Sequence, residues 1–110
     1  MNQRAETPFT LRLRRAVQAC RDLKPPYSPL DFERMLNDCG GDFVPRAKKM
    51  LREDIHDGLR KLAKRNKSEL SLEWIIAHEP EWNDLFSDED RELALGRLRI
   101  APDLPPVSRR

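Results

Sequence analysis

Residues 71–98 read SLEWIIAHEPEWNDLFSDEDRELALGRL, and this stretch decides the fold class. Ser71 and Ser87 each precede a run in which apolar residues recur every three or four positions, the spacing of a helix with one buried face. Asp90 falls in the first turn of the second run, where a carboxylate is favoured by the helix dipole. Pro80 ends the first run, because proline lacks the amide hydrogen that a continuing helix needs. The stretch therefore predicts two short helices joined by a turn.

The buried sides of these two helices follow from the same spacing. They comprise Leu72, Ile75 and Ile76 in the first helix, and Leu93, Ala94 and Leu98 in the second. The connection holds three large apolar residues that we expect to form a plug: Trp82, Leu85 and Phe86. Trp74 falls outside the first apolar stripe, so we expect its ring to reach the surface.

Helical spacing also marks the N-terminal part of the chain. Thr7 is the expected N-cap and Pro8 the first residue of a helix that should stop near Lys24, before Pro25 and Pro26. Its apolar stripe is Phe9, Leu13, Ala16, Val17, Cys20 and Leu23.

The sequence YSPLDF marks the start of a second helix. We expect Ser28 as the cap, Pro29 at the first position and Asp31 at the third, a short capping box. Gly40 and Gly41 should end this helix, because glycine accepts the left-handed backbone of a helix C-terminus. The predicted inward residues are Phe32, Met35, Leu36 and Cys39.

Two further short helices are predicted between residues 43 and 66. The first buries Phe43 or Val44, Ala47 and Leu51, with Arg46, Lys48, Lys49 and Arg52 outside. We expect a break near Ile55 and His56, because Gly58 within one long helix would cost about 1 kcal/mol relative to alanine. A new helix would then be capped by Asp57, bury Leu59 and Leu62, and end at Asn66.

These patterns predict an all-α fold, a single compact domain of five or six short helices over residues 1–100. The proline-rich tail at 101–110 is expected to be flexible. No run of alternating β-branched residues predicts a strand. No apolar run approaches the ~20 residues of a membrane-spanning helix, and the start MNQRAETPF lacks a signal-peptide core. We therefore expect a soluble, cytoplasmic protein that does not associate with membranes.

From Tyr27 onward the order of motifs resembles a known family. YSPLDFERMLNDCGG, RAKKML, DGLRKL and the block containing PEWNDLF are similar, in that order, to a widespread family of small helical modules in bacterial and phage hypothetical proteins. The similarity covers residues 27–98 and excludes the arginine-rich segment 1–24. It implies a helical fold and carries no established activity.

Charge is sorted along the chain although the net charge is only +2. Residues 45–68 hold nine Lys and Arg against three acidic residues, whereas 69–92 hold nine Asp and Glu against Arg91 alone. The local electrostatic field of a protein, more than its net charge, governs how it associates with partners. Either region could therefore attract a partner of opposite charge.

Catalytic and metal-binding patterns are not recognisable. The cysteines at 20 and 39 and the histidines at 56 and 78 lack the paired ligands, two to four residues apart, of structural zinc. Both cysteines lie on apolar stripes and should be buried, reduced thiols. No nucleophile or phosphate-binding loop is placed by a motif. We predict a non-enzyme without metal or cofactor.

Two binding surfaces follow from the charge. The first is an acidic and aromatic patch for a larger protein, formed by Trp74, Glu79, Glu81 and Asp84; the alternative is an ordinary solvated surface. It predicts a non-enzymatic interaction module, a small adaptor, inhibitor or regulator of bacterial or phage origin. The second is a nucleic-acid-binding face, the alternative function, formed by Arg12, Arg14, Arg15, Arg21, Arg46, Lys49, Lys61 and Lys64.

Overall fold

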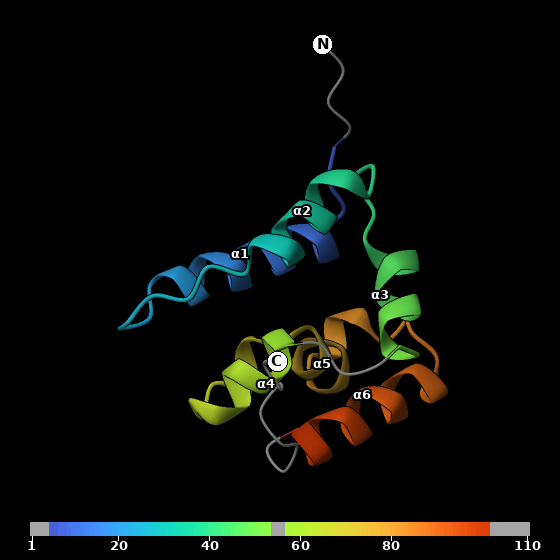
Figure 1. The fold of residues 1–110 in the computed structure, drawn as a ribbon. Coiled ribbons are helices and arrows are strands. Elements are labelled where there is room, and N and C mark those ends of the chain that lie inside the picture. The colour runs from blue at the N-terminus through green and yellow to red at the C-terminus, as the bar shows by residue number, and fades with distance from the viewer. Residues whose placement is uncertain (1–4, 54–56, 102–110) are drawn as a thin grey trace. The chain divides into compact units, whose positions relative to one another are not determined.

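The computed structural model describes residues 5–53 and 57–101. Over these ranges the secondary structure is helical, with six α-helices, two 3₁₀ turns and no strand (Figure 1). The predicted all-α fold of five or six short helices is confirmed. The elements are α1 (Pro8–Arg21), α2 (Leu30–Asp38), α3 (Val44–Leu51), α4 (Asp57–Lys64), η1 (Ser68–Leu70), α5 (Leu72–His78), η2 (Pro80–Trp82) and α6 (Asp88–Ile100).

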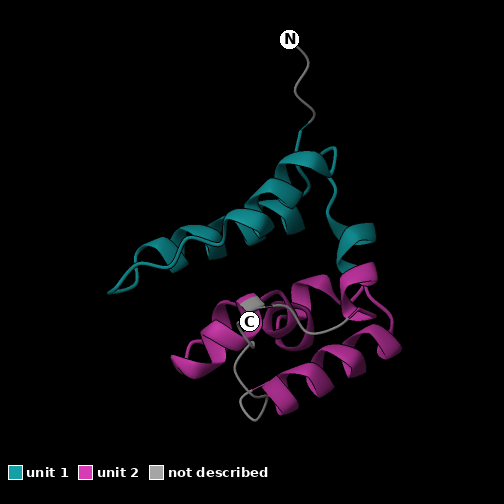
Figure 2. Ribbon diagram, viewed as in Figure 1, with its two compact units in different colours: residues 1–47 teal, residues 48–110 magenta. Residues whose placement is uncertain are grey.

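The helices fall into two compact units, which we call unit 1 (residues 1–47) and unit 2 (residues 48–110) (Figure 2). The division lies within α3. The expectation of one domain over residues 1–100 stays a prediction. The expected break at Ile55 and His56, and the tail from residue 102 onward, lie outside the described residues.

Unit 1 is built on the packing of α1 against α2. The predicted stripe of α1 is buried from Phe9 to Cys20. Thr10, which the apolar pattern does not include, is also fully buried, and its hydroxyl accepts a hydrogen bond from the Phe43 amide at 3.0 Å. The Thr7 amide donates to the Gly41 carbonyl at 2.9 Å. These two bonds join the start of α1 to the segment that follows α2.

The ends of the unit 1 helices test the capping predictions. Thr7 is the N-cap of α1, with its hydroxyl accepting from the Thr10 amide, as predicted. The helix ends at Arg21, about one turn before the expected stop near Lys24. It ends there because the chain reverses and the Tyr27 amide donates a hydrogen bond to the Cys20 carbonyl. Gly40 and Gly41 have φ of 71° and 95°, so the predicted glycine ending is confirmed.

The capping box predicted for α2 is wrong. Pro29, not Ser28, is the N-cap, and no side chain caps this helix. The Leu30 amide donates to the backbone carbonyl of Ser28. The Asp31 carboxylate accepts a hydrogen bond from Arg34 and not from the amide of Ser28. Of the four residues predicted to face inward, Leu36 is buried, while Phe32, Met35 and Cys39 are half-buried.

Unit 2 is organised around the packing of α5 against α6, with η1 contacting both α4 and α5. Ser71 caps α5 by accepting from the Trp74 amide at 3.1 Å, as predicted. Leu72, Ile75 and Ile76 are buried, as are Leu59 and Leu62 of α4. Asn66 has φ of 57°, which confirms the left-handed end predicted for α4.

Two predictions about buried apolar residues in unit 2 need correction. Leu85 does not belong to the plug, because it is 39% exposed while Trp82 and Phe86 are buried. On α6, Ala94 is buried but Leu93 and Leu98 are only half-buried. The buried face of this helix instead follows the positions of Asp90, Ala94, Arg97 and Ala101.

Candidate functional site

The connection between α5 and α6, residues 79–87, forms a turn that we call the acidic turn. It begins where Pro80 stops α5, and the Glu79 amide closes the helix on the Ile75 carbonyl at 3.1 Å. The Trp82 indole N–H donates to Glu79 Oε1 at 2.9 Å, and the Trp82 ring is 9% exposed. Phe86 is 3% exposed. Buried aromatic residues therefore fix the turn at two points.

The exposed side of the acidic turn carries carboxylates that form no ion pair in the described part of the chain. Glu81, Asp84 and Leu85 are exposed. No ion pair joins Glu81 or Asp84 to another residue in the described part of the chain. Glu79 differs from them, because it is half-buried and accepts a hydrogen bond from the indole N–H of Trp82. The predicted acidic patch thus contains one structural carboxylate and two that face solvent.

Trp74 lies on α5, one turn before the acidic turn begins. It is half-buried, and its ring lies against the ring of His78 with centroids 4.9 Å apart and planes at 45°. The expected surface position is therefore met only in part, because the residue as a whole is half-buried. The pair leaves an aromatic surface at the end of α5, where the chain enters the turn.

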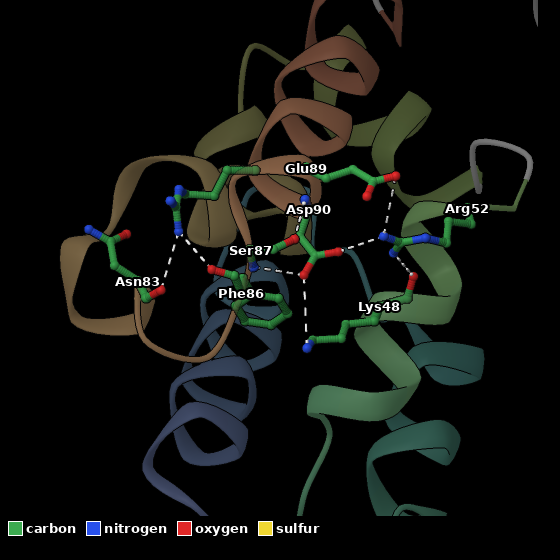
Figure 3. A network of polar contacts seen from close by, with 8 residues as sticks. Lys48, Arg52, Asn83, Phe86, Ser87, Glu89 and Asp90 are labelled. Carbon is green, nitrogen blue, oxygen red and sulfur yellow. Dashed lines mark hydrogen bonds and ion pairs between the residues drawn. The ribbon is translucent and has the colours of Figure 1, made fainter.

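The far end of the acidic turn is fixed by the start of α6 (Figure 3). The Ser87 hydroxyl accepts from the Asp90 amide at 3.1 Å, and Asp90 Oδ2 accepts from the Ser87 amide at 2.9 Å, a complete capping box. Arg91 donates to the backbone carbonyls of Asn83 and Phe86 at 3.3 and 2.8 Å. Side chains of α6 therefore hold the turn's backbone.

Asp90 also forms ion pairs with Lys48 of α3 and with Arg52, which directly follows α3 (Figure 3). Arg52 Nη2 lies 2.8 Å from Asp90 Oδ1, and Lys48 Nζ lies 4.0 Å from Asp90 Oδ2. Burial alone would raise the pKa of this carboxyl, but the hydrogen bonds from Ser87 and Arg52 outweigh it, so the pKa lies below its ordinary value. The network links α3 to the start of α6.

A second polar network lies inside unit 2 and was not expected from the sequence. Arg97 and Glu73 are 7% and 4% exposed, and Arg97 Nε donates to Glu73 Oε2 at 2.9 Å. Arg97 Nη1 also donates to the carbonyl of Leu51 at 3.3 Å and to that of Glu53. One guanidinium therefore ties α5, α6 and the end of α3 together.

The basic residues predicted to bind nucleic acid are not equivalent in the structure. Arg14 makes two hydrogen bonds with Glu6, at 2.7 and 2.6 Å. These bonds raise the pKa of Arg14 and lower that of Glu6. Arg21 forms an ion pair with Glu33. Arg14 and Arg21 are thus engaged within unit 1.

Arg46 lies beside a hollow of about 260 Å³, although the spacing predicted it outside. Met35, Asp38 and Cys39 line the rest of this hollow. Arg46 Nη2 approaches Met35 Sδ at 3.3 Å, and the Cys39 thiol donates to the Leu36 carbonyl at 3.2 Å. Arg46 is therefore half-buried against α2.

Four of the remaining predicted cations are exposed. Arg15 is exposed and Arg12 is half-buried on α1, and Lys49 is exposed on α3. Lys61 and Lys64 are both exposed on α4, one turn apart, so the structure brings this pair together. Arg12, Arg14, Arg15, Arg21 and Arg46 belong to unit 1, whereas Lys49, Lys61 and Lys64 belong to unit 2.

The cysteines are both free thiols, with Cys20 buried as predicted and Cys39 half-buried. Among the described residues, no three His, Cys, Asp or Glu side chains are grouped to hold a metal ion. None of the described helices has the length and apolar character needed to cross a bilayer. Comparison with protein-family models, curated proteins and solved structures finds no match to this chain.

Proposed function

We propose that this protein is a non-enzymatic interaction module, a small adaptor, inhibitor or regulator that docks a larger protein through the acidic turn. The observation that carries the proposal is the exposure of Leu85 between Glu81, Asp84 and the start of α6, on a turn fixed by buried aromatic residues. Protein interfaces combine an apolar centre with a charged rim. The acidic turn offers both within a few residues.

Rigidity supports the proposal. A loop that orders only on binding loses conformational entropy, which weakens affinity. The acidic turn is held by Trp82, Phe86, the capping box of α6 and the hydrogen bonds of Arg91. Its exposed side chains therefore meet a partner on a fixed backbone. The complementary surface would present Lys or Arg around an apolar pocket for Leu85.

We expect Glu81→Lys/Asp84→Lys to weaken capture of the partner protein about tenfold, because two attractive charges become repulsive at the rim of the interface. In the measurement, the chain is immobilised and incubated with lysate at low salt. The amount of any partner protein retained in stoichiometric ratio to the chain is then quantified. The matched control is Glu69→Lys/Glu92→Lys, which makes the same charge change at two other exposed positions of unit 2.

Leu85→Ala separates the apolar contact from the electrostatic one. It should weaken capture while leaving its salt dependence unchanged, because only the buried apolar area differs. Equal losses in the acidic-turn variant and the matched control would contradict the proposal, since they would indicate a response to net charge alone. Failure of the native chain to retain a stoichiometric protein would do the same.

A further inference from the structure

The end of α4 carries the densest positive charge in unit 2. Residues 60–67 contain five cations and no acidic residue, and we call this stretch the α4 basic segment: Arg60, Lys61, Lys64, Arg65 and Lys67. Lys61, Lys64 and Lys67 are exposed, while the two arginines are half-buried. This charge lies apart in sequence from the acidic turn.

The apolar residues of α4 fix which side of the helix faces solvent. Leu59 and Ala63 are 3% and 7% exposed and pack in one cluster with Ala101 at the end of α6. Leu62 is 4% exposed. Lys61 and Lys64 are one turn apart on the exposed side, and side chains at this spacing have Cβ atoms about 5–6 Å apart. Two ammonium groups can therefore reach neighbouring phosphates.

The backbone holds Lys67 close to the helix. Its amide donates to the Leu62 carbonyl at 2.8 Å, and the Asn66 amide donates to the Ala63 carbonyl at 3.1 Å. Together with the left-handed conformation of Asn66, these bonds close the C-terminus of α4. The cations after the helix are thus held on a defined turn, next to those of its last turn.

We propose that the α4 basic segment binds the phosphate backbone of a nucleic acid without reading its sequence. The chemistry of the segment selects this partner. Every apolar side chain of residues 58–67 is buried, so the segment offers neither the apolar centre of a protein interface nor the exposed apolar face of a membrane-surface helix. What remains is charge, and charge is what phosphate contacts require.

The same residues argue against sequence recognition. Base edges are read by Asn, Gln, Ser, Thr or Arg side chains entering a groove. Among the described residues of the segment, Asn66 is the one neutral side chain of this kind, and the two arginines, Arg60 and Arg65, are half-buried. The nearest acidic residue after the segment is the exposed Glu69 of η1, and η1 contacts α4. Its carboxylate opposes a bound phosphate.

The test is a salt titration of binding to a fluorescein-labelled DNA duplex of about 20 base pairs, followed by anisotropy. With four phosphate contacts, affinity should fall about 100-fold between roughly 50 and 200 mM salt. Lys61→Gln/Lys64→Gln should lower affinity at least tenfold at the lower salt and reduce the slope of the log–log plot by about 2. Glu69→Gln should strengthen binding.

The matched control is Arg15→Gln/Lys24→Gln, which removes the same charge from exposed positions of unit 1. It should bind as the native chain does, and far-UV circular dichroism should show equal helix content in all variants. Equal losses in the two double variants, or no binding at the lowest salt, would overturn the proposal. So would binding only to phosphatidylserine vesicles, or a preference between two unrelated duplex sequences.

The acidic-turn variant makes the two proposals independent. Glu81→Lys/Asp84→Lys should not weaken DNA binding, because these residues lie outside the α4 basic segment. Loss of protein capture together with intact DNA binding would leave the inference about α4 standing. Conversely, loss of DNA binding in Lys61→Gln/Lys64→Gln with intact protein capture would show that DNA binding does not depend on the acidic turn's partner.

Discussion

Arg97→Ala is expected to lower the free energy of unfolding of unit 2 by about 3–5 kcal/mol, the usual cost of removing one partner of a buried ion pair. Glu73 is 4% exposed and would be left without its cation in the interior. The carbonyls of Leu51 and Glu53 would also lose the donors that Arg97 supplies. The buried Leu51 carbonyl, left unpaired, adds to the loss.

Urea unfolding followed by tryptophan fluorescence measures this effect in unit 2, because Trp74 and Trp82 both belong to it. Arg99→Ala is the control, since Arg99 is exposed on the same helix and should cost less than about 0.5 kcal/mol. Replacing both partners, as in Glu73→Leu/Arg97→Met, should recover part of the loss because no buried charge remains. Similar midpoints for Arg97→Ala and Arg99→Ala would refute the structural role.

Asp90→Ala should destabilise unit 2 by about 2 kcal/mol, combining the loss of a capping box with that of a hydrogen bond to a charged group. The side chain of Asp90 is 3% exposed, but that of Arg52 is 44% exposed, so solvent screens part of their attraction. The Ser87 amide would also lose its acceptor.

The lowered pKa of Asp90 also predicts a pH dependence. Because the folded-state pKa lies below the unfolded one, this group's contribution is complete above the unfolded pKa and is lost as pH falls through the folded pKa. The urea midpoint of the native chain should therefore decline below about pH 5 more steeply than that of Asp90→Asn. Asp88→Asn is the matched control, because it removes a carboxylate from the same first turn of α6 and leaves the capping box intact. Parallel profiles for all three proteins would show that Asp90 does not titrate as described.

Local capping rules predicted three of the six described helix starts. Thr7, Ser71 and Ser87 each cap a helix as their position before a periodic run indicates. The same rule failed at Ser28, because Pro29 takes the cap position and the backbone carbonyl of Ser28 accepts the Leu30 amide. A serine followed by proline can therefore mark a helix start without supplying its hydroxyl.

The buried charges could not be predicted from apolar spacing. Asp90, Ala94, Arg97 and Ala101 follow helical spacing, so a stripe that admits charged residues would have identified the buried face of α6. The partner of Arg97 is 24 residues away in sequence, and the carbonyls it bonds are more than 40 away. A periodic pattern within one helix does not indicate contacts between residues so far apart in sequence. This network could therefore be identified only from the three-dimensional structure.

The acidic turn shows a related limit. Its carboxylates were predicted as a group, yet hydrogen bonding divides them into Glu79, which holds the indole of Trp82, and Glu81 and Asp84, which face solvent. Leu85 was placed with its apolar neighbours because hydrophobicity alone favours burial. The turn holds two aromatic side chains inside and leaves the smaller leucine outside.

The bond between the Thr10 hydroxyl and the Phe43 amide has a kinetic consequence for unit 1. It joins residues 33 positions apart, with α2 lying between them in sequence. Short helices form in under about a microsecond, whereas a contact between distant residues requires loop-closure entropy to be lost before the contact stabilises the chain. Neither helix alone secures Phe43, so folding of unit 1 should be limited by the encounter between the start of α1 and the chain beyond Gly41. Its transition state would then contain this long-range contact.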